Sequence, residues 1–240
     1  MAEVRLAVIE FVGYREWTES LGSDREWLIQ IIQSEMYALA QRRAAEAGAH
    51  VLPMRYDYMM LLASNVKKDQ LAIVLDSIKE NSQVPVRMAS ACGKTPMEAE
   101  MKAWTLLRDT QPGGLSYNRC SSDERVALAH IDIDNITAMT RKMGATRTYY
   151  IVVDLLQRIS EKASKYGSIV QYLGGDNILA VLPPESHRHI VGELISFDSV
   201  ELKAGVGYAA TARTALSLAA EALHEIRTGT PEKIVYKNKV

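Results

Sequence analysis

Short apolar runs alternate with amphipathic stretches along the whole chain. In the second half, apolar runs bounded by turn-forming residues predict strands at 125–132, 168–173, 177–182 and 200–208. Apolar residues at helical spacing predict helices at 145–166, 186–195 and 211–227. This is the βαββαβ order of a ferredoxin-like or palm unit, with an antiparallel hairpin at its centre and one further helix.

The first half repeats this pattern in a diverged form. RLAVIEF, from Arg5, matches RVALAHI, from Arg125, which lies 120 residues later. RYDYMMLLAS matches LGGDNILAVL with Asp57 opposite Asp176, 119 residues later, and VRMASACGKT matches LKAGVGYAAT, 116 residues later. We therefore predict an α+β protein of two tandem units packed around a pseudo-twofold axis. The predicted bounds are 1–110 for the first unit, 111–124 for a linker rich in turn-forming residues, and 125–240 for the second unit.

Composition narrows the class of protein. The chain has 28 Lys plus Arg and 29 Asp plus Glu, so its net charge of −1 predicts no nucleic-acid or anionic-membrane partner. No apolar run approaches the roughly 20 residues of a membrane span. The two cysteines, Cys92 and Cys120, form no CxxC pair and indicate no disulfide framework. We therefore expect a cytoplasmic protein.

The first candidate site is HIDIDNIT, which begins at His130. Strand alternation places His130 and Asp132 on one face, and it places Asp132 and Asp134 near the end of the strand. Two carboxylates there are costly to bury unless a cation or hydrogen-bond donors satisfy them. Mg²⁺ prefers such oxygen ligands together with substrate phosphates. The alternative is that Asp134 or Asn135 only caps the following turn.

The second candidate site is GGDN, between two apolar strands. Gly174 and Gly175 can adopt positive φ and let a ligand approach the backbone, with Asp176 at the tip of the hairpin. The alternative is an ordinary tight turn. In a βαββαβ unit the end of the first strand adjoins the central hairpin, so we expect Asp132 and Asp176 to converge and hold one or two divalent cations.

These motifs carry a family resemblance. HIDIDNIT, GGDN and the stretch 202–227 together resemble archaeal GTP cyclohydrolase III, and more broadly the palm domains of GGDEF diguanylate cyclases and adenylyl cyclases. The resemblance implies an enzyme that hydrolyses GTP to 2-amino-5-formylamino-6-ribosylamino-4(3H)-pyrimidinone 5′-phosphate and releases phosphate. It also implies two Mg²⁺ ions, a monovalent cation such as K⁺, and a homo-oligomer, either a dimer or a tetramer. A nucleotidyl-cyclase-like enzyme and a non-catalytic GTP-binding sensor are the alternatives.

The resemblance also implies roles for individual residues. Asp132 and Asp176 become the catalytic metal ligands, assisted by the backbone of Ile133. The residues expected near the nucleotide in the same unit are Asn135, Gly174, Gly175, Asn177 and Lys203. Lys203 is a candidate phosphate contact, and the alternative for it is a solvated strand lysine.

The first unit departs from the family pattern. Many members have an Asp in its first strand where this chain has Val12, so we expect this unit to have lost one metal-type carboxylate. Arg55 and Asp57 remain candidates for nucleotide binding, because Arg suits phosphate oxygens and a carboxylate can accept from guanine N1–H and its amino group. The alternative is that these two residues pair with each other. Thr95, followed by Pro96, is predicted to cap a helix.

Overall fold

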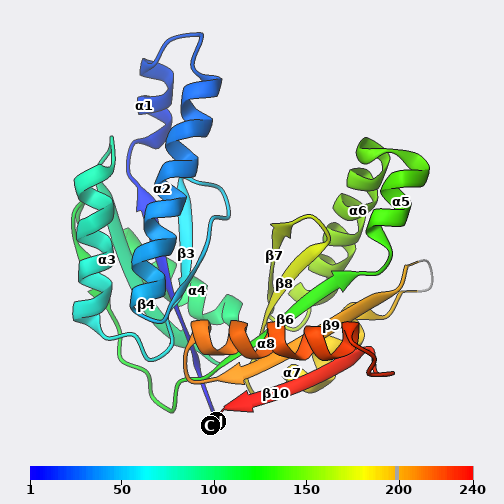
Figure 1. Cartoon of the computed structure of the whole chain (residues 1–240). Coiled ribbons are helices and arrows are strands. Elements are labelled where there is room, and N and C mark those ends of the chain that lie inside the picture. The colour runs from blue at the N-terminus through cyan, green and yellow to red at the C-terminus, as the bar shows by residue number, and fades with distance from the viewer. Residues whose placement is uncertain (198–199, 240) are drawn as a thin grey trace.

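The computed structural model describes residues 1–197 and 200–239, which form two units of the same topology (Figure 1). Each unit contains one five-stranded sheet. The first sheet consists of β1 (Val4–Phe11), β2 (His50–Leu52), β3 (Tyr58–Leu62), β4 (Val86–Gly93) and β5 (Leu115–Tyr117). The second consists of β6 (Val126–Ile133), β7 (Ile169–Gly174), β8 (Asn177–Leu182), β9 (Leu202–Ala209) and β10 (Ile234–Lys239).

Four helices accompany each sheet. Those of the first unit are α1 (Tyr14–Ser20), α2 (Glu26–Glu46), α3 (Lys68–Asn81) and α4 (Pro96–Arg108). Those of the second unit are α5 (Ile136–Met143), α6 (Ala145–Ser164), α7 (His187–Ile195) and α8 (Ala212–Arg227). No helix in the described part of the chain is long and apolar enough to cross a membrane.

The strand order confirms the predicted α+β, ferredoxin-like topology. The orders β2-β3-β1-β4-β5 and β7-β8-β6-β9-β10 are the same when the equivalent strands are matched. In both sheets the first four of these strands pair antiparallel, and a fifth strand is added in parallel at the edge. We did not predict these edge strands. β5 lies inside the stretch 111–124, so part of the expected linker belongs to the first sheet.

Three apolar clusters hold the molecule together. One lies between the first sheet and α2 and α3, and a second lies between the second sheet and α6 and α7. The third contains residues of both units, from Leu6 and Ala103 of the first to Leu128 and Ala215 of the second. The inner faces of the two sheets therefore share one core with α4 and α8.

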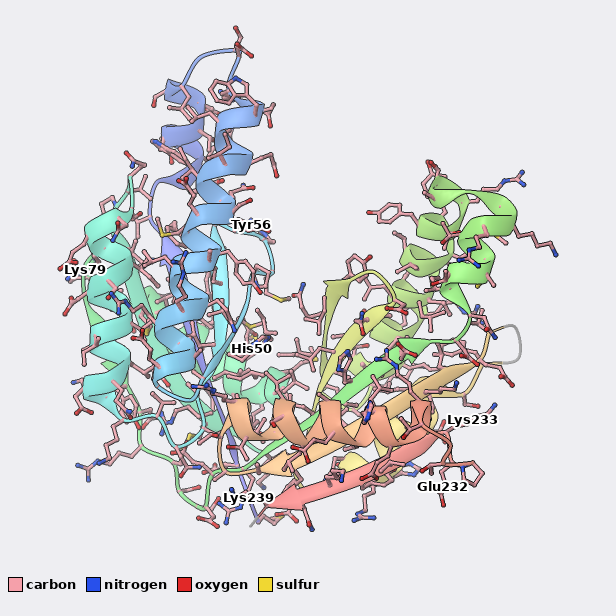
Figure 2. The ribbon with its side chains drawn as sticks, viewed as in Figure 1. His50, Tyr56, Lys79, Glu232, Lys233 and Lys239 are labelled. Atoms are coloured by element: carbon pink, nitrogen blue, oxygen red, sulfur yellow. A yellow bond between two sulfur atoms is a disulfide. The ribbon has the colours of Figure 1, made fainter. Side chains whose placement is uncertain are left out.

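Two reciprocal contacts join the units. Gly48, after α2, lies against Thr211 at the start of α8, and Gly167, after α6, lies against Thr95 at the start of α4. Each glycine carbonyl accepts a backbone hydrogen bond from the helix that it meets, at 3.1 Å from Arg213 and at 3.0 Å from Met97. His50 follows the first contact and lies where the first unit approaches α8 (Figure 2). This reciprocity is the pseudo-twofold relation that the repeat predicted.

The pairing of the strands corrects the match between the first strands of the two units. In the first unit, Glu10 of β1 pairs with Tyr58 of β3. In the second unit, Asp132 of β6 pairs with Asn177 of β8. Tyr58 and Asn177 are equivalent in the repeat, so Glu10 is the counterpart of Asp132. The separation is therefore 122 residues rather than the 120 taken from the apolar pattern.

The cysteines also differ from expectation. Cys92, in β4, and Cys120, beyond β5, form a disulfide, and their Cα atoms are 5.4 Å apart. The Arg5 guanidinium, 1% exposed, lies beside this bond and pairs with Glu124 at 3.1 Å. The sequence spacing of 28 residues gave no hint of this pairing, because only the parallel β5 brings the segment after it back to β4.

Candidate functional site

Asp132 and Asp176 lie at the same end of the second sheet. Asp132 is the next-to-last residue of β6, and Asp176 immediately precedes β8, which pairs with β6. The backbone N–H of Ile133 donates to the carbonyl oxygen of Asp176 at 3.2 Å. The strand end and the hairpin tip therefore adjoin through their backbones.

Asp132 is a buried acid with a cationic partner. It is 6% exposed and lies on the inner face of β6, the face that also carries Leu128. Its carboxylate accepts from the guanidinium of Arg227, the last residue of α8. The Arg227 side chain is 48% exposed, so this counter-charge comes from the solvent side. A buried carboxylate without such a partner would be strongly destabilising.

A chain of hydrogen bonds links the strand to the hairpin. Asn177 Nδ2 donates to Asp176 Oδ1 at 2.8 Å, and Asn177 Oδ1 lies 2.8 Å from His130 Nε2. Because the amide oxygen can only accept, Nε2 of His130 is assigned the proton. Asn177 thereby fixes the orientation of the Asp176 carboxylate relative to β6.

The other predicted residues of this unit surround the two acids. Lys203, on β9, is the strand partner of Asp132, and its Nζ lies 3.0 Å from Asp134 Oδ1. Asn135 starts α5 with φ at 59° and makes no side-chain cap. Both hairpin glycines have positive φ, 104° at Gly174 and 63° at Gly175, as the sequence led us to expect.

A groove of about 460 Å³ opens beside Asp176, between the hairpin and the two helices that follow β6. Hydroxyl groups and one guanidinium line much of it. Its polar lining residues are Thr137, Thr140, Arg141, Thr148, Tyr149, Tyr172 and Asp176. The groove therefore offers hydrogen-bond donors next to Asp176.

The first unit has its own polar cluster at the equivalent place. Glu10 accepts from the Tyr58 hydroxyl at 2.9 Å and pairs with Arg87, its neighbour on β4. Burial, and then the hydrogen bond to Glu10, raise the pKa of Tyr58 to about 12. The strand pairing makes Glu10 the counterpart of Asp132, so the unit keeps an acid at that position. The loss of the family's carboxylate at Val12 stays a prediction.

Arg55 and Asp57 pair with each other at 2.6 Å. The second oxygen of Asp57 is buried and has no hydrogen-bond partner. Among residues 1–197 and 200–239, no hydrogen bond or ion pair joins Arg55 or Asp57 to the acids of the second unit. The predicted site residues thus fall into two groups, one in each unit.

Sequence reasoning missed three residues of these clusters, Glu10, its partner Arg87, and Arg227. Glu10 carried a signal, since it is a charged residue in phase with the apolar inner-face positions of β1. Arg227 carried none, because it meets Asp132 from 95 residues away only through the packing of α8 on the sheet.

Sequence comparisons with a family model and with individual proteins point to the same family. The family model of GTP cyclohydrolase III matches residues 4–239. A GTP cyclohydrolase III from Aeropyrum pernix is 55% identical over 225 residues, which cover 94% of this chain and 92% of that protein. A GTP cyclohydrolase III from Saccharolobus solfataricus is 32% identical over 224 residues, 93% of this chain and 95% of that protein.

Solved structures similar to this chain cover about half of it. The active GGEEF domain of a diguanylate cyclase from Vibrio cholerae has a TM-score of 0.39 and 17% identity, over 48% of this chain and 82% of that chain. A bacterial light-regulated adenylyl cyclase has a TM-score of 0.40 and 14% identity, over 47% and 74%.

Proposed function

This chain belongs to the GTP cyclohydrolase III family, and from that premise we propose that Asp132 and Asp176 form the metal-dependent catalytic centre of a GTP cyclohydrolase III. The observation that supports the proposal is the backbone hydrogen bond from Ile133 to Asp176, which joins the strand end that carries Asp132 to the hairpin tip that carries Asp176. The reaction is the hydrolysis of GTP.

The donor set fits a hard divalent cation. Two carboxylates and the nearby backbone of Ile133 supply only oxygen ligands, the kind that Mg²⁺ binds together with phosphate. Arg227 already provides Asp132 with a positive charge, which is consistent with a position that favours a cation. When bound, Mg²⁺ would neutralise phosphate charge and polarise a bound oxygen or water.

The residues around the acids bind and orient the substrate. Lys203 and the positive-φ backbone at Gly174 and Gly175 are proposed to contact phosphate, since a lysine and open backbone N–H groups both suit phosphate oxygens. The Asn177 amide nitrogen donates to the Asp176 carboxylate and holds it in place. The Asn177 amide oxygen accepts from His130, which fixes the orientation of the amide. Asn135, which immediately precedes the α5 residues that line the groove, is proposed as a further nucleotide contact.

We propose the full reaction that the family implies. Water adds to guanine C8, the imidazole ring opens, and the formyl group stays on the product. The triphosphate is cut to a monophosphate with release of phosphate. The product is 2-amino-5-formylamino-6-ribosylamino-4(3H)-pyrimidinone 5′-phosphate.

In the first unit, Arg55 and Asp57 are proposed as nucleotide contacts. The unpartnered oxygen of Asp57 supports this, because a buried carboxylate oxygen normally has a donor. Two Mg²⁺ ions, activation by a monovalent cation such as K⁺, and a homo-oligomer complete the proposal. Exposed apolar side chains at Tyr149, Tyr150 and Val153 of α6 support self-association.

The test is turnover of GTP by Asp132→Ala, Asp132→Asn and Asp176→Ala. Each variant is incubated with GTP and Mg²⁺ while loss of purine absorbance and release of phosphate are followed. We expect a fall of at least about 100-fold in kcat/KM, because each change removes a metal ligand. Asp24→Ala, at an exposed acid, is the matched control and should keep the wild-type rate.

Three results would contradict the proposal in different ways. A near-normal rate in both Asp176→Ala and Asp132→Asn would show that the acids do not form the centre. Cyclic product in chromatography of the wild-type reaction would identify a nucleotidyl cyclase. Binding of GTP by the wild type without consumption would identify a sensor.

A further inference from the structure

A second cavity, of about 450 Å³, lies between the two units and away from the acidic pair. The inner face of the first sheet forms one wall, α4 forms another, and the residues around the start of β7 close it from the second unit. The lining side chains that the argument uses are Arg55, Tyr58, Glu100, Met101, Trp104 and Ser168.

One face of α4 is turned to this cavity. Met97, Glu100, Met101 and Trp104 all line the cavity and are spaced three or four residues apart, so they share one helix face. Met101 is 57% exposed, and the Trp104 ring meets the Tyr58 ring edge-on with centroids 5.1 Å apart. Flexible thioethers beside an aromatic pair form a wall suited to a flat apolar ring.

Two polar groups of the cavity lack partners. Glu100 is half-buried, its carboxyl group has no ion pair or hydrogen bond in the described part of the chain, and burial raises its pKa. Ser168 is 4% exposed, and its hydroxyl has no hydrogen-bond partner. Buried polar atoms are nearly always paired, so the Ser168 hydroxyl lacks a partner that a bound molecule would supply, and the partly exposed Glu100 carboxyl is free to accept from the same molecule.

We propose that this cavity binds the guanine base of a nucleotide, with Glu100 as the residue that recognises it. A carboxylate can accept from the N1–H and the 2-amino group of guanine at once, a pair of donors that adenine does not present. Trp104 provides the flat apolar contact, and the Ser168 hydroxyl pairs with a polar atom on the ring. Arg55, 73% exposed at the mouth, pairs with Asp57 through one nitrogen and keeps its other N–H groups for a phosphate.

The cavity is a separate site from the metal centre. Ser168 immediately precedes β7, and Asp176 follows the far end of that strand. Six residues of strand at about 3.3 Å each separate the two places by roughly 20 Å. Occupation of the cavity therefore requires no ligand at Asp176, and the inference extends the proposal for Arg55 without depending on the proposed catalytic acids.

The internal repeat does not produce the same site twice. The residue of α8 that corresponds to Glu100 is Leu216, because Thr95 and Thr211 start the two helices at equivalent positions. The counterpart of Trp104 on the same basis is Ala220. The second unit thus has neither the acid nor the aromatic wall, so the site belongs to α4 alone.

The test is calorimetric titration of the full chain with GMP, IMP and AMP in EDTA, where a metal-dependent site does not hold phosphate. IMP differs from GMP only by the 2-amino group. We expect the wild type to bind GMP at one site per chain, about tenfold more tightly than IMP, and AMP more weakly still. Glu100→Gln should lower the affinity for GMP at least about tenfold, so that GMP and IMP bind equally tightly.

Glu80→Gln, at an exposed acid of α3, is the matched control and should bind GMP like the wild type. Ser168→Ala should lower the affinity for GMP without changing the ratio of the GMP and IMP affinities. Equal GMP binding by Glu100→Gln and Glu80→Gln would overturn the inference, and so would equal affinity of the wild type for GMP and IMP. If Met101→Lys instead abolishes self-association while Glu100→Gln binds normally, a second copy of the chain covers this face and the inference fails. None of these results bears on turnover by Asp132 and Asp176 variants.

Discussion

The reciprocal glycine contacts between the units allow a self-controlled test of the interface. Gly48 and Gly167 both follow a long helix and both have positive φ, 82° and 68°. A Cβ added at Gly48 would lie 3.6 Å from Thr211, which is ordinary contact, whereas one added at Gly167 would lie 2.6 Å from Oγ1 of Thr95. The same substitution therefore adds backbone strain at both positions and a steric clash at only one.

The expected losses of unfolding free energy follow from the backbone strain at both glycines and the steric clash at Gly167. Alanine in the left-handed region costs about 1–2 kcal/mol, and this applies to both variants. Overpacking a filled contact costs a further ~1–3 kcal/mol, which applies only at Gly167. We expect Gly48→Ala to lower the free energy of unfolding by about 1–2 kcal/mol and Gly167→Ala to lower it by about 2–5 kcal/mol.

The assay is urea unfolding followed by circular dichroism, with equal m-values required for the comparison. Thr95→Gly removes the clashing side chain at a cost of only a few tenths of a kcal/mol as an N-cap. In the double variant with Gly167→Ala, the overpacking should disappear, so the two changes should be strongly non-additive. Equal decreases in the free energy of unfolding for Gly48→Ala and Gly167→Ala would refute the contact geometry. Additive decreases in the double variant would refute it as well.

Two further predictions concern stability. The disulfide between Cys92 and Cys120 closes a separation of 28 residues, so Cys120→Ser should lower the free energy of unfolding by about 3–4 kcal/mol; reductant should destabilise the wild type equally and the variant not at all. Burial lowers the pKa of His50 to about 4. Between pH 6.5 and about 4, His50 is therefore protonated in the unfolded chain but neutral in the folded chain. Stability should fall by up to ~3 kcal/mol between pH 6.5 and 4, and unfolding curves of His50→Gln should show a correspondingly flatter pH dependence.

The sequence predicted the repeated βαββαβ order because each strand and helix carries its own apolar period. The helix predicted at 145–166 is α6, and the hairpin around Gly175 lies where its glycines indicated. The edge strands β5 and β10 were not predicted, because their side chains are only partly buried or exposed and show no apolar alternation. Their pairing comes from the neighbouring strand, which sequence periodicity does not report.

The site was predictable where a residue and its role lie in one local motif. Asp132 lies near the end of one apolar strand and Asp176 in the glycine turn before another, so their positions followed from strand alternation and turn chemistry. The registration of β1 was not predictable, because an apolar run matches its partner almost as well when it slides by two residues and keeps the same face. Only backbone pairing distinguishes Glu10 from Val12 as the counterpart of Asp132.

That register also shows how the two units, which share a fold, pair an equivalent acid with a cation. Both have an acid at the equivalent strand position, but they neutralise it differently. In the first unit Arg87, 20% exposed and one strand away, pairs with Glu10, which also accepts from the Tyr58 hydroxyl. In the second unit the cation is Arg227, half-exposed at the end of a helix. The two acids differ little in exposure, 15% for the Glu10 side chain and 8% for that of Asp132, so the contrast between the units lies in the exposure of the arginine. The two units thus have an acid at the equivalent strand end, and under the proposed function the one paired with the more exposed arginine is the metal ligand.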